Sequence, residues 1–409
     1  MEKGEYQAKK KVLIVYTEMI LGGATNSLIS MLNSFDYSKY DVELLLYENK
    51  GILQDKIPTG VTILEQAKIC RSIFSDIAKK LLSPFYIYSV LKSFYYKIKT
   101  KNKLVRIQIM SAAGASLSRR LEKEYDIAIS YLEFWPLNYT AHFVKAKHKI
   151  AWIHIDYLQS GLLVRLDEPA FSKIHRIVFV SRQCLNNFAR LCPKYARKAV
   201  YIENIMLQEQ IQMAAKHNGL LLPPRNENVM RLVSTCRISF SQKGLDRGVK
   251  AFGVLRDKGL INNVEWYIIG DGEDMPVLRK MIEDEKLEKH IILLGSKVNP
   301  LGYVSECDFF FLPSLYEGKP LAVTEALMLG LPALVTNYAS ASEQIENYVD
   351  GLIVENSVQG IIEGLEILIN NPGLREQMKK AVASKDYSNV EAVKQLEKVL
   401  EELVPEELQ

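Results

Sequence analysis

The stretch that decides the fold lies at residues 309–336, where short apolar runs enclose a loop and the start of a helix. Residues 309–312 read FFFL, residues 316–326 read YEGKPLAVTEA, and residues 333–336 read ALVT. Continuous rather than alternating apolarity is typical of parallel strands that are covered on both faces. The sequence therefore predicts strand, loop, helix and strand in that order, with two glutamates and a glycine after the first strand.

The same alternation of short apolar runs with helical patterns extends from this stretch along the rest of the chain. A first series of runs lies at 12–16, 42–47, 61–64, 127–131, 150–155, 177–180 and 200–202. A second series lies at 232–235, 264–269, 291–294, 309–312, 333–336 and 352–354. Strands that alternate with helices imply parallel sheets. The sequence thus predicts an α/β protein with two Rossmann-like, doubly wound domains.

A polar, proline-containing stretch at 216–228 separates the two series. A chain of 409 residues with 48% apolar composition is long enough for two cores, because single cores stop growing near about 250–300 residues. We expect an N-terminal domain at 1–205, a C-terminal domain at 206–385, and a helical segment at 386–409 that crosses back to the first domain. Ligands of such sheets bind beyond the carboxyl ends of the strands, and two facing domains leave a cleft between them.

Charge, cysteine content and hydropathy narrow the class of protein. The 52 basic and 48 acidic side chains give a formal net charge of +4, which does not favour a general nucleic-acid binder. The five cysteines form no C-x-x-C pair, so neither a disulfide framework nor a zinc site is indicated. No apolar run approaches the roughly 20 residues of a spanning helix, and the run at 12–16 fits a first strand better than a signal peptide. We expect a cytoplasmic protein with reduced thiols.

Two carboxylates eight residues apart are the first candidate site residues. Glu317 falls in the loop after the apolar run, and we expect Glu325 about two turns into the following helix. Each can accept hydrogen bonds from sugar hydroxyls, Gly318 lets the backbone approach a ligand, and the amides that open the helix near Leu321 can bind an anionic group. The alternative is a pair of solvated surface charges. The apolar neighbours at 326–335 favour a buried Glu325, which then needs a partner.

A basic pair follows the predicted strand at 232–235. Arg237 offers a planar fork to phosphate oxygens, and Lys243 offers a compact charge. Taken singly, each is more often an exposed loop residue. Their place after a strand favours a phosphate site.

Other candidates also stand at strand ends. Gly22 and Gly23 follow the first strand and open a helix, as the approach of a phosphate requires. Gly270 begins a Gly-Asp-Gly turn, whose alternative interpretation is a tight turn without a ligand. His154 ends an apolar run, where a histidine is often a satisfied core residue. No histidines show H-E-x-x-H spacing, so a catalytic metal is not indicated.

With their spacing, these residues resemble the retaining glycosyltransferases of family GT4, whose E-x7-E signature matches Glu317 and Glu325. The resemblance covers nearly the whole chain and is strongest over residues 231–354. It implies the GT-B architecture, in which an acceptor-side first domain and a nucleotide-sugar-binding second domain face each other across a cleft. The chain has no D-x-D motif, which argues against the metal-dependent GT-A class.

The resemblance also implies roles for the site residues. Glu325 would bind the ribose of the donor, while Glu317 and His154 would lie near the donor sugar and Arg237 and Lys243 would hold the diphosphate. The positions that the resemblance places around the donor also include Gly318, Lys319, Pro320, Leu321, Gly22, Gly23, Gly270, Lys297 and Val298. Among them, the Lys297–Val298 backbone would lie near the base and the Gly22–Gly23 pair near the phosphates. Lys319 and Pro320 stand where the family often has a phenylalanine and a glycine, so the resemblance does not identify the donor sugar.

The implied reaction is transfer of a sugar, by default from a UDP-hexose, with retention and without a metal or cofactor. A sugar-nucleotide epimerase or a glycan phosphorylase on the same architecture remains an alternative. A non-catalytic subunit that binds sugar nucleotide is a second alternative, from a different class. The intact Glu317, Glu325, Arg237 and Lys243 argue against that subunit.

Residues 77–121 contain ten basic side chains and no acidic one, interleaved with aromatic residues. Such a segment resembles a surface that pairs aromatic anchors with anionic lipid headgroups. The alternatives are a solvated pair of helices whose aromatic residues face the core, and, less favoured, a nucleic-acid surface. We expect peripheral attachment to the inner face of a bacterial membrane, where a lipid-linked saccharide of a surface polysaccharide would be the acceptor.

Overall fold

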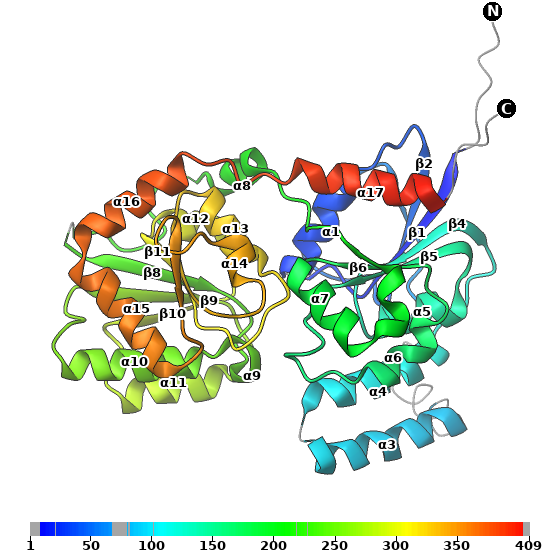
Figure 1. The fold of residues 1–409 in the computed structure, drawn as a ribbon, viewed down its shortest axis with the longest axis horizontal. Coiled ribbons are helices and arrows are strands. Elements are labelled where there is room, and N and C mark those ends of the chain that lie inside the picture. The colour runs from blue at the N-terminus through cyan, green and yellow to red at the C-terminus, as the bar shows by residue number, and fades with distance from the viewer. Residues whose placement is uncertain are drawn as a thin grey trace, which may run out of the picture. The chain divides into compact units, whose positions relative to one another are not determined.

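The computed structural model describes residues 9–20, 22–67, 80, 82–100, 102–217, 219–226 and 228–403 (Figure 1). The chain divides into two compact units, Met1–Asn204 with Glu391–Gln409, and Ile205–Val390. The last helix, α17 (Val390–Leu403), is joined to the first unit by ion pairs, Lys39 with Glu401 at 4.0 Å and Arg176 with Glu402 at 3.7 Å. The final segment therefore returns to the N-terminal unit.

The first unit is built on a seven-stranded sheet in the order β3-β2-β1-β4-β5-β6-β7, with every pairing parallel. Its strands are β1 (Lys10–Tyr16), β2 (Tyr40–Leu46), β3 (Val61–Ile63), β4 (Glu124–Ser130), β5 (Lys145–Ile153), β6 (Arg176–Phe179) and β7 (Ala199–Tyr201). Its other helices are α1 (Gly23–Asn33), α3 (Pro84–Thr100), α4 (Lys103–Ser116), α5 (Trp135–Phe143), α6 (Val164–Phe171) and α7 (Arg182–Leu191), with 3-10 turns η1 (Gln54–Lys56) and η2 (Pro193–Lys198). All seven predicted strands of this unit are present.

The second unit is built on a six-stranded parallel sheet in the order β10-β9-β8-β11-β12-β13. Its strands are β8 (Met230–Thr235), β9 (Val264–Ile269), β10 (Ile291–Gly295), β11 (Phe309–Leu312), β12 (Ala333–Thr336) and β13 (Gly351–Val354). Its helices are α8 (Gln208–Ala215), α9 (Phe240–Lys243), α10 (Leu245–Asp257), α11 (Met275–Asp284), α12 (Leu301–Ser305), α13 (Leu321–Met328), α14 (Ala341–Gln344), α15 (Val358–Asn370) and α16 (Pro372–Ala383). The predicted β11–α13–β12 unit is confirmed.

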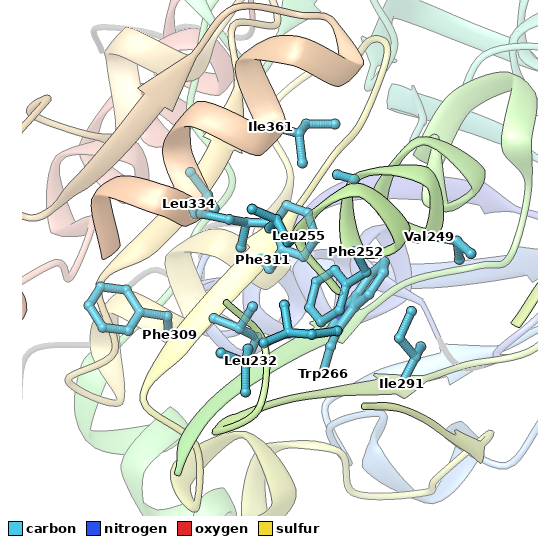
Figure 2. Close-up of a cluster of buried hydrophobic side chains, with 14 of the residues drawn as sticks. Leu232, Val249, Phe252, Leu255, Trp266, Ile291, Phe309, Phe311, Leu334 and Ile361 are labelled. Atoms are coloured by element: carbon cyan, nitrogen blue, oxygen red, sulfur yellow. The ribbon is translucent and has the colours of Figure 1, made fainter. Parts of the chain in front are cut away.

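Helices cover both faces of the second sheet, which explains why its strands are continuously apolar. On one face, Trp266 of β9 and Phe311 of β11 pack against Phe252 of α10 and Ile361 of α15 (Figure 2). On the other face, α13 packs with Val323 against the strands. The helices packed on both faces hold the sheet, and with it the loops at the strand ends, in place.

Both sheets reverse their strand order at one place, between β1 and β4 in the first unit and between β8 and β11 in the second. In doubly wound sheets, ligands bind at the carboxyl ends of the strands beside such a reversal. The loops after β8 and β11, and those after β1 and β4, are therefore the places to look for a site.

Helix α3 presents its apolar side chains to solvent. It packs on α4 through Ser89, Ser93 and Tyr96, three buried residues spaced along one face. Its large exposed apolar side chains are Phe85, Ile87, Tyr88, Val90, Leu91, Phe94, Tyr95 and Ile98. The interpretation in which these aromatic residues face the core is therefore wrong, except for Tyr96. Within the described residues, every helix is too short or too polar to span a bilayer.

Candidate active site

The loop after β8 carries the predicted basic pair. Arg237 is exposed, and its guanidinium contacts Gln242 Oε1 at 3.5 Å. Lys243 ends the short helix α9, and Gly244 follows with φ of 60°, where a Cβ atom would stand 2.4 Å from the Pro313 carbonyl oxygen. Glycine is required at this close approach, which brings the end of α9 against the end of β11.

Lys243 and Glu317 form an ion pair at the carboxyl ends of the adjacent strands β8 and β11. Lys243 Nζ lies 2.6 Å from Glu317 Oε1, and the Ser314 hydroxyl donates to the same oxygen at 2.6 Å. Glu317 is buried, and its loop is held because the Leu315 N–H donates to the Gln242 carbonyl at 2.7 Å. The structure thus joins two residues that the sequence placed in separate motifs.

Glu325 lies on α13 and is 7% exposed. Because α13 begins only at Leu321, Glu325 is just over one turn into the helix. The expectation of about two turns is wrong, since residues 318–320 form a loop rather than helix. Pro320 is the residue before the helix, and its carbonyl accepts from Gln344 at 3.0 Å, which fixes the start of α13.

The ammonium group of Lys319 is largely shielded from water. Burial lowers the pKa of Lys319 to about 8, and the nearby Glu343 carboxylate partly opposes this shift. A lysine whose pKa is lowered by burial is a candidate for contact with a ligand.

The turn after β9 packs on the Arg237 loop. A Cβ atom on Gly270, whose φ is 146°, would stand 1.9 Å from the Cys236 carbonyl oxygen. The Ile238 N–H donates to the Asp271 carbonyl at 2.9 Å, and the Phe240 N–H to Asp274 Oδ2 at 2.7 Å. Gly270 thus has a clear role inside the unit, which is to support the loop that carries Arg237. After β10, Lys297 lies over the Tyr303 ring at 5.3 Å and Val298 is exposed.

In the first unit, the loop after β1 leads directly into α1. Gly22 is the N-cap residue and Gly23 the first helical residue, as predicted. A Cβ atom on Gly22 would have no described heavy atom within 4 Å, so packing does not require glycine there. Nearby hydroxyls are paired: Tyr16 with Thr25 at 3.0 Å, and Ser27 with the Tyr131 hydroxyl at 2.6 Å.

His154 follows β5 at the same edge. Burial lowers its pKa to about 4, partly offset by a hydrogen bond with the Tyr131 backbone, so the imidazole is neutral at pH 7. Its Nε2 atom is buried and has no hydrogen-bond partner in the structure. The interpretation of His154 as a satisfied core residue is therefore wrong, because one ring nitrogen is not satisfied.

Sequence reasoning missed Glu133, which follows β4 beside the strand reversal of the first sheet. It is 7% exposed, its Oε2 accepts the His154 backbone N–H at 3.1 Å, and burial raises its pKa to about 7. The next residue, Phe134, has φ of 66° and ψ of −117°, a conformation that costs a bulky residue of order 1–3 kcal/mol. A single glutamate after a strand carries no spacing signal, so only the fold identifies it.

The predicted residues thus fall into two groups, one in each unit. Arg237, Lys243, Gly270, Lys297, Val298, Glu317, Gly318, Lys319, Pro320, Leu321 and Glu325 follow the four adjacent strands β10, β9, β8 and β11. Gly22, Gly23 and His154 follow β1 and β5. In the portion of the chain that the structure describes, no cluster of His, Cys, Asp and Glu side chains is arranged to hold a metal ion.

Two parallel, doubly wound sheets of this order define the GT-B fold of glycosyltransferases. The solved structure of Anabaena Alr3699/HepE in complex with UDP-glucose superimposes with a TM-score of 0.68, covering 96% of this chain and 100% of that one at 15% identity. Residues 213–385 match the family described as glycosyl transferases group 1. The second unit of this chain is therefore similar to the group 1 glycosyl transferases.

Curated relatives match part of the chain. An uncharacterized glycosyltransferase of Haemophilus influenzae is 32% identical over 215 residues, 51% of this chain and 57% of the relative. The UDP-Gal:alpha-D-GlcNAc-diphosphoundecaprenol alpha-1,3-galactosyltransferase of Escherichia coli is 32% identical over 145 residues, 35% of this chain and 37% of the relative. The chain thus spans between about a third and three fifths of the length of these two relatives.

Proposed function

We propose that this protein is a retaining, metal-independent glycosyltransferase of the GT4 type that transfers a hexose from UDP to a hydroxyl of a lipid-linked saccharide. The observation that carries the proposal is the Lys243–Glu317 pair, which lies at the strand reversal of the second sheet, with Arg237 in the loop after β8 and Glu325 on α13. The similarity to a relative whose name contains a UDP-sugar donor and a diphosphoundecaprenol acceptor supports both substrate classes.

The chemistry needs positive charge where the nucleoside diphosphate leaves. Negative charge grows on the leaving phosphate while the sugar gains oxocarbenium character, and preorganised cations stabilise that change. Arg237 and Lys243 supply this charge, and Glu317 holds Lys243 in place through a 2.6 Å contact. Glu325 accepts hydrogen bonds from the ribose. Retention follows when the acceptor hydroxyl attacks from the face that the diphosphate leaves and gives its proton to a phosphate oxygen.

Labelled donor distinguishes this function from its alternatives. The purified protein is incubated with UDP-hexose labelled in the sugar, with and without a diphosphopolyprenol-linked saccharide. Transfer places the label in the lipid fraction only when the acceptor is present, and NMR of the product shows the anomer of the donor. An epimerase changes the nucleotide sugar without an acceptor, and a phosphorylase requires inorganic phosphate. Binding and turnover are also measured for a panel of UDP-, GDP- and dTDP-sugars. If a sugar nucleotide binds but none is turned over, the protein is a non-catalytic subunit.

An enzyme that acts on a lipid-linked acceptor has to contact the membrane surface, and α3 has a face that suits this contact. Eight large apolar side chains face solvent along this helix, and the charged side chains among its residues are Lys92, Lys97 and Lys99. Two of these lysines lie over tyrosine rings, Lys92 over Tyr88 at 5.6 Å and Lys99 over Tyr95 at 5.5 Å. An exposed apolar face with basic flanks suits the headgroup region of an anionic bilayer. We therefore place the peripheral membrane contact on α3, within residues 77–121.

The proposed membrane contact does not use every basic residue of 77–121. Arg119 pairs with Glu65, and the Arg120 guanidinium lies over the Phe143 ring. Lys79 and Lys101 lie outside the described residues. Each basic side chain near an anionic surface contributes roughly 1 kcal/mol, so the three lysines of α3 support only reversible attachment.

Vesicle sedimentation tests the membrane contact. The protein is expected to sediment with vesicles of anionic lipid at low salt and much less with neutral vesicles. Leu91→Glu and Phe94→Glu, at side chains 66% and 61% exposed, are expected to abolish sedimentation without loss of stability. Val277→Glu, at a side chain 50% exposed on α11, is the matched control and is expected to sediment normally. Equal binding of both lipids, or of neither, contradicts the contact and favours a soluble acceptor.

A further inference from the structure

The strand reversal of the first sheet holds a buried carboxyl group that the proposed mechanism does not use. Glu133 follows β4 and is 7% exposed. Across the part of the chain that the structure describes, no lysine or arginine forms an ion pair with it. Buried carboxylates are normally paired, so an unpaired one beside a strand reversal is a candidate ligand group.

Backbone strain next to Glu133 shows that this loop is held in one conformation. Phe134 has φ of 66° and ψ of −117°, and its carbonyl oxygen accepts from both the backbone and the side chain of Asn138, at 3.1 and 2.8 Å. A strained conformation persists only where the surrounding structure imposes it, and such residues cluster at functional sites. The start of α5 thus fixes the position of the Glu133 carboxyl group.

Glu133 acts on His154 through the backbone. Its Oε2 accepts the His154 N–H at 3.1 Å, and the His154 ring lies 5.0 Å from the Tyr131 ring. The imidazole is neutral, and its buried Nε2 atom has no hydrogen-bond partner. A neutral imidazole nitrogen donates or accepts one hydrogen bond, according to its tautomer, and a hydroxyl group can be its partner in either case.

The other titratable groups around Glu133 already have partners. Tyr16 of β1 bonds Thr25, and Tyr131 after β4 bonds Ser27. Tyr157, in the loop before α6, donates to Asp167 Oδ2 at 2.6 Å, and the Asp167 charge raises the pKa of Glu133 further. Among the buried atoms here without a hydrogen-bond partner are His154 Nε2, Trp152 Nε1 and Asp167 Oδ1, and of their side chains His154 is the one whose backbone Glu133 holds.

We propose that Glu133 is a positioning residue that sets His154 to bind a hydroxyl of a saccharide. The proposal rests on the proposed glycosyl transfer, which supplies two saccharides, the donor hexose and the acceptor. The ionised carboxylate holds the His154 backbone N–H, and protonation weakens that bond and releases the histidine. Saccharide binding is therefore expected to weaken as the pH falls below about 7.

Glu133→Gln tests the proposal because glutamine keeps the shape and the accepting oxygen but cannot ionise. Binding of UDP, UDP-glucose and a diphosphopolyprenol-linked saccharide is measured by calorimetry between pH 6 and 8, alongside the KM of each substrate. The wild type is expected to bind one saccharide about tenfold more weakly at pH 6 than at pH 8. The variant is expected to bind it equally at both, and UDP is expected to bind both proteins alike.

The arms of this experiment separate the two sources of the hydroxyl. A change confined to UDP-glucose assigns it to the donor sugar, and one confined to the lipid-linked saccharide assigns it to the acceptor. Glu168→Gln, at an exposed residue of α6 that pairs with Lys194, is the matched control and is expected to behave as wild type. Unchanged saccharide affinity and an unchanged pH profile in Glu133→Gln would overturn the proposal. A wild type that binds donor but never transfers sugar overturns the proposed function instead.

Discussion

Lys243 and Glu317 differ from Arg237 in what their loss does to the folded state. Lys243→Met removes the ammonium group that lies 2.6 Å from the buried Glu317 carboxylate, which then keeps only its hydrogen bond from the Ser314 hydroxyl. Breaking a fully buried ion pair costs about 3–5 kcal/mol of stability. Because Lys243 is partly exposed, we expect a smaller loss of stability, about 1–3 kcal/mol. Arg237→Met, at an exposed side chain, is expected to change stability by less than about 0.5 kcal/mol.

Both variants are expected to lose turnover, by about 100-fold or more, if each cation stabilises the leaving diphosphate. Urea unfolding and transfer assays on the same preparations separate the two effects. Arg237→Met with full activity would remove Arg237 from the mechanism.

Glu325 provides a test of the donor site. Glu325→Gln keeps the size of the side chain on α13 but removes the charged acceptor for the ribose hydroxyls. We expect UDP affinity to fall by about tenfold, since a hydrogen bond to a charged group contributes about 1.5–3 kcal/mol. Calorimetry with UDP measures the loss, and Glu363→Gln on α15 is a matched glutamate control. Wild-type affinity in Glu325→Gln would contradict the assignment of the E-x7-E motif.

The lowered pKa of Lys319 predicts how this residue changes the free energy of unfolding with pH. Its pKa is lowered to about 8 in the folded state, against about 10.5 in the unfolded chain, so below pH 8 its charge opposes folding. Lys319→Met is therefore expected to raise the free energy of unfolding at pH 7, by at most about 3 kcal/mol, and to lose this gain as the pH rises from 8 to 10.5. Urea unfolding at pH 7 and pH 10 measures both values, with Lys280→Met on α11 as the exposed control. An equal gain at both pH values would show that the charge is not the cause.

At the level of elements, the turn after β9 shows how packing positions a site loop. Gly270→Ala would place a Cβ atom 1.9 Å from the Cys236 carbonyl at φ of 146°, so the Arg237 loop has to move. We expect a loss of more than about 2 kcal/mol together with weaker binding of UDP. Gly259→Ala is the control, because its φ of 73° is also positive but its Cβ would meet no described heavy atom within 4 Å. It is expected to cost only about 1 kcal/mol of strain.

The elements themselves were largely predictable from the sequence, and their exposed faces were not. The 13 strands within the described residues were all predicted, with ends that differ by at most five residues, because strands covered on both faces are continuously apolar. The sequence also showed the aromatic residues of α3, but their orientation depends on how α3 packs against α4. In that packing, Tyr96 is buried with Val105 and Ile109 of α4. The end of α13 nearest Glu317 was placed a turn too early because Pro320 precedes the helix instead of lying within it.

For the candidate site, the sequence identified groups whose spacing repeats a known signature and missed those that only the fold brings together. Glu317 and Glu325 lie eight residues apart and were found by their spacing. Lys243 and Glu317 lie 74 residues apart, and their contact depends on the pairing of β8 with β11 and on Gly244. Glu133 and His154 are joined in the same way through the pairing of β4 with β5.

At the scale of the whole molecule, the two groups of residues belong to separate units with separate cores, so their ligands should act on different parts of the chain. If the second unit binds the nucleotide, UDP protects backbone amides in the loops after β8 and β11 and in α13, where Arg237, Lys243, Glu317 and Glu325 lie. At about 100 times its Kd, a ligand stabilises the state that it binds by about 2.7 kcal/mol, which slows exchange through global unfolding of that unit about 100-fold. Hydrogen exchange followed by mass spectrometry resolves this unit by unit, with the protein free, with UDP and with a lipid-linked saccharide. We expect UDP to protect the second unit and the saccharide to protect the loops after β4 and β5 of the first, with Glu325→Gln weakening only the former and Glu133→Gln removing only the pH dependence of the latter. Protection by UDP confined to the first unit would contradict the assignment of the nucleotide to β8 and β11, whatever the activity of the protein.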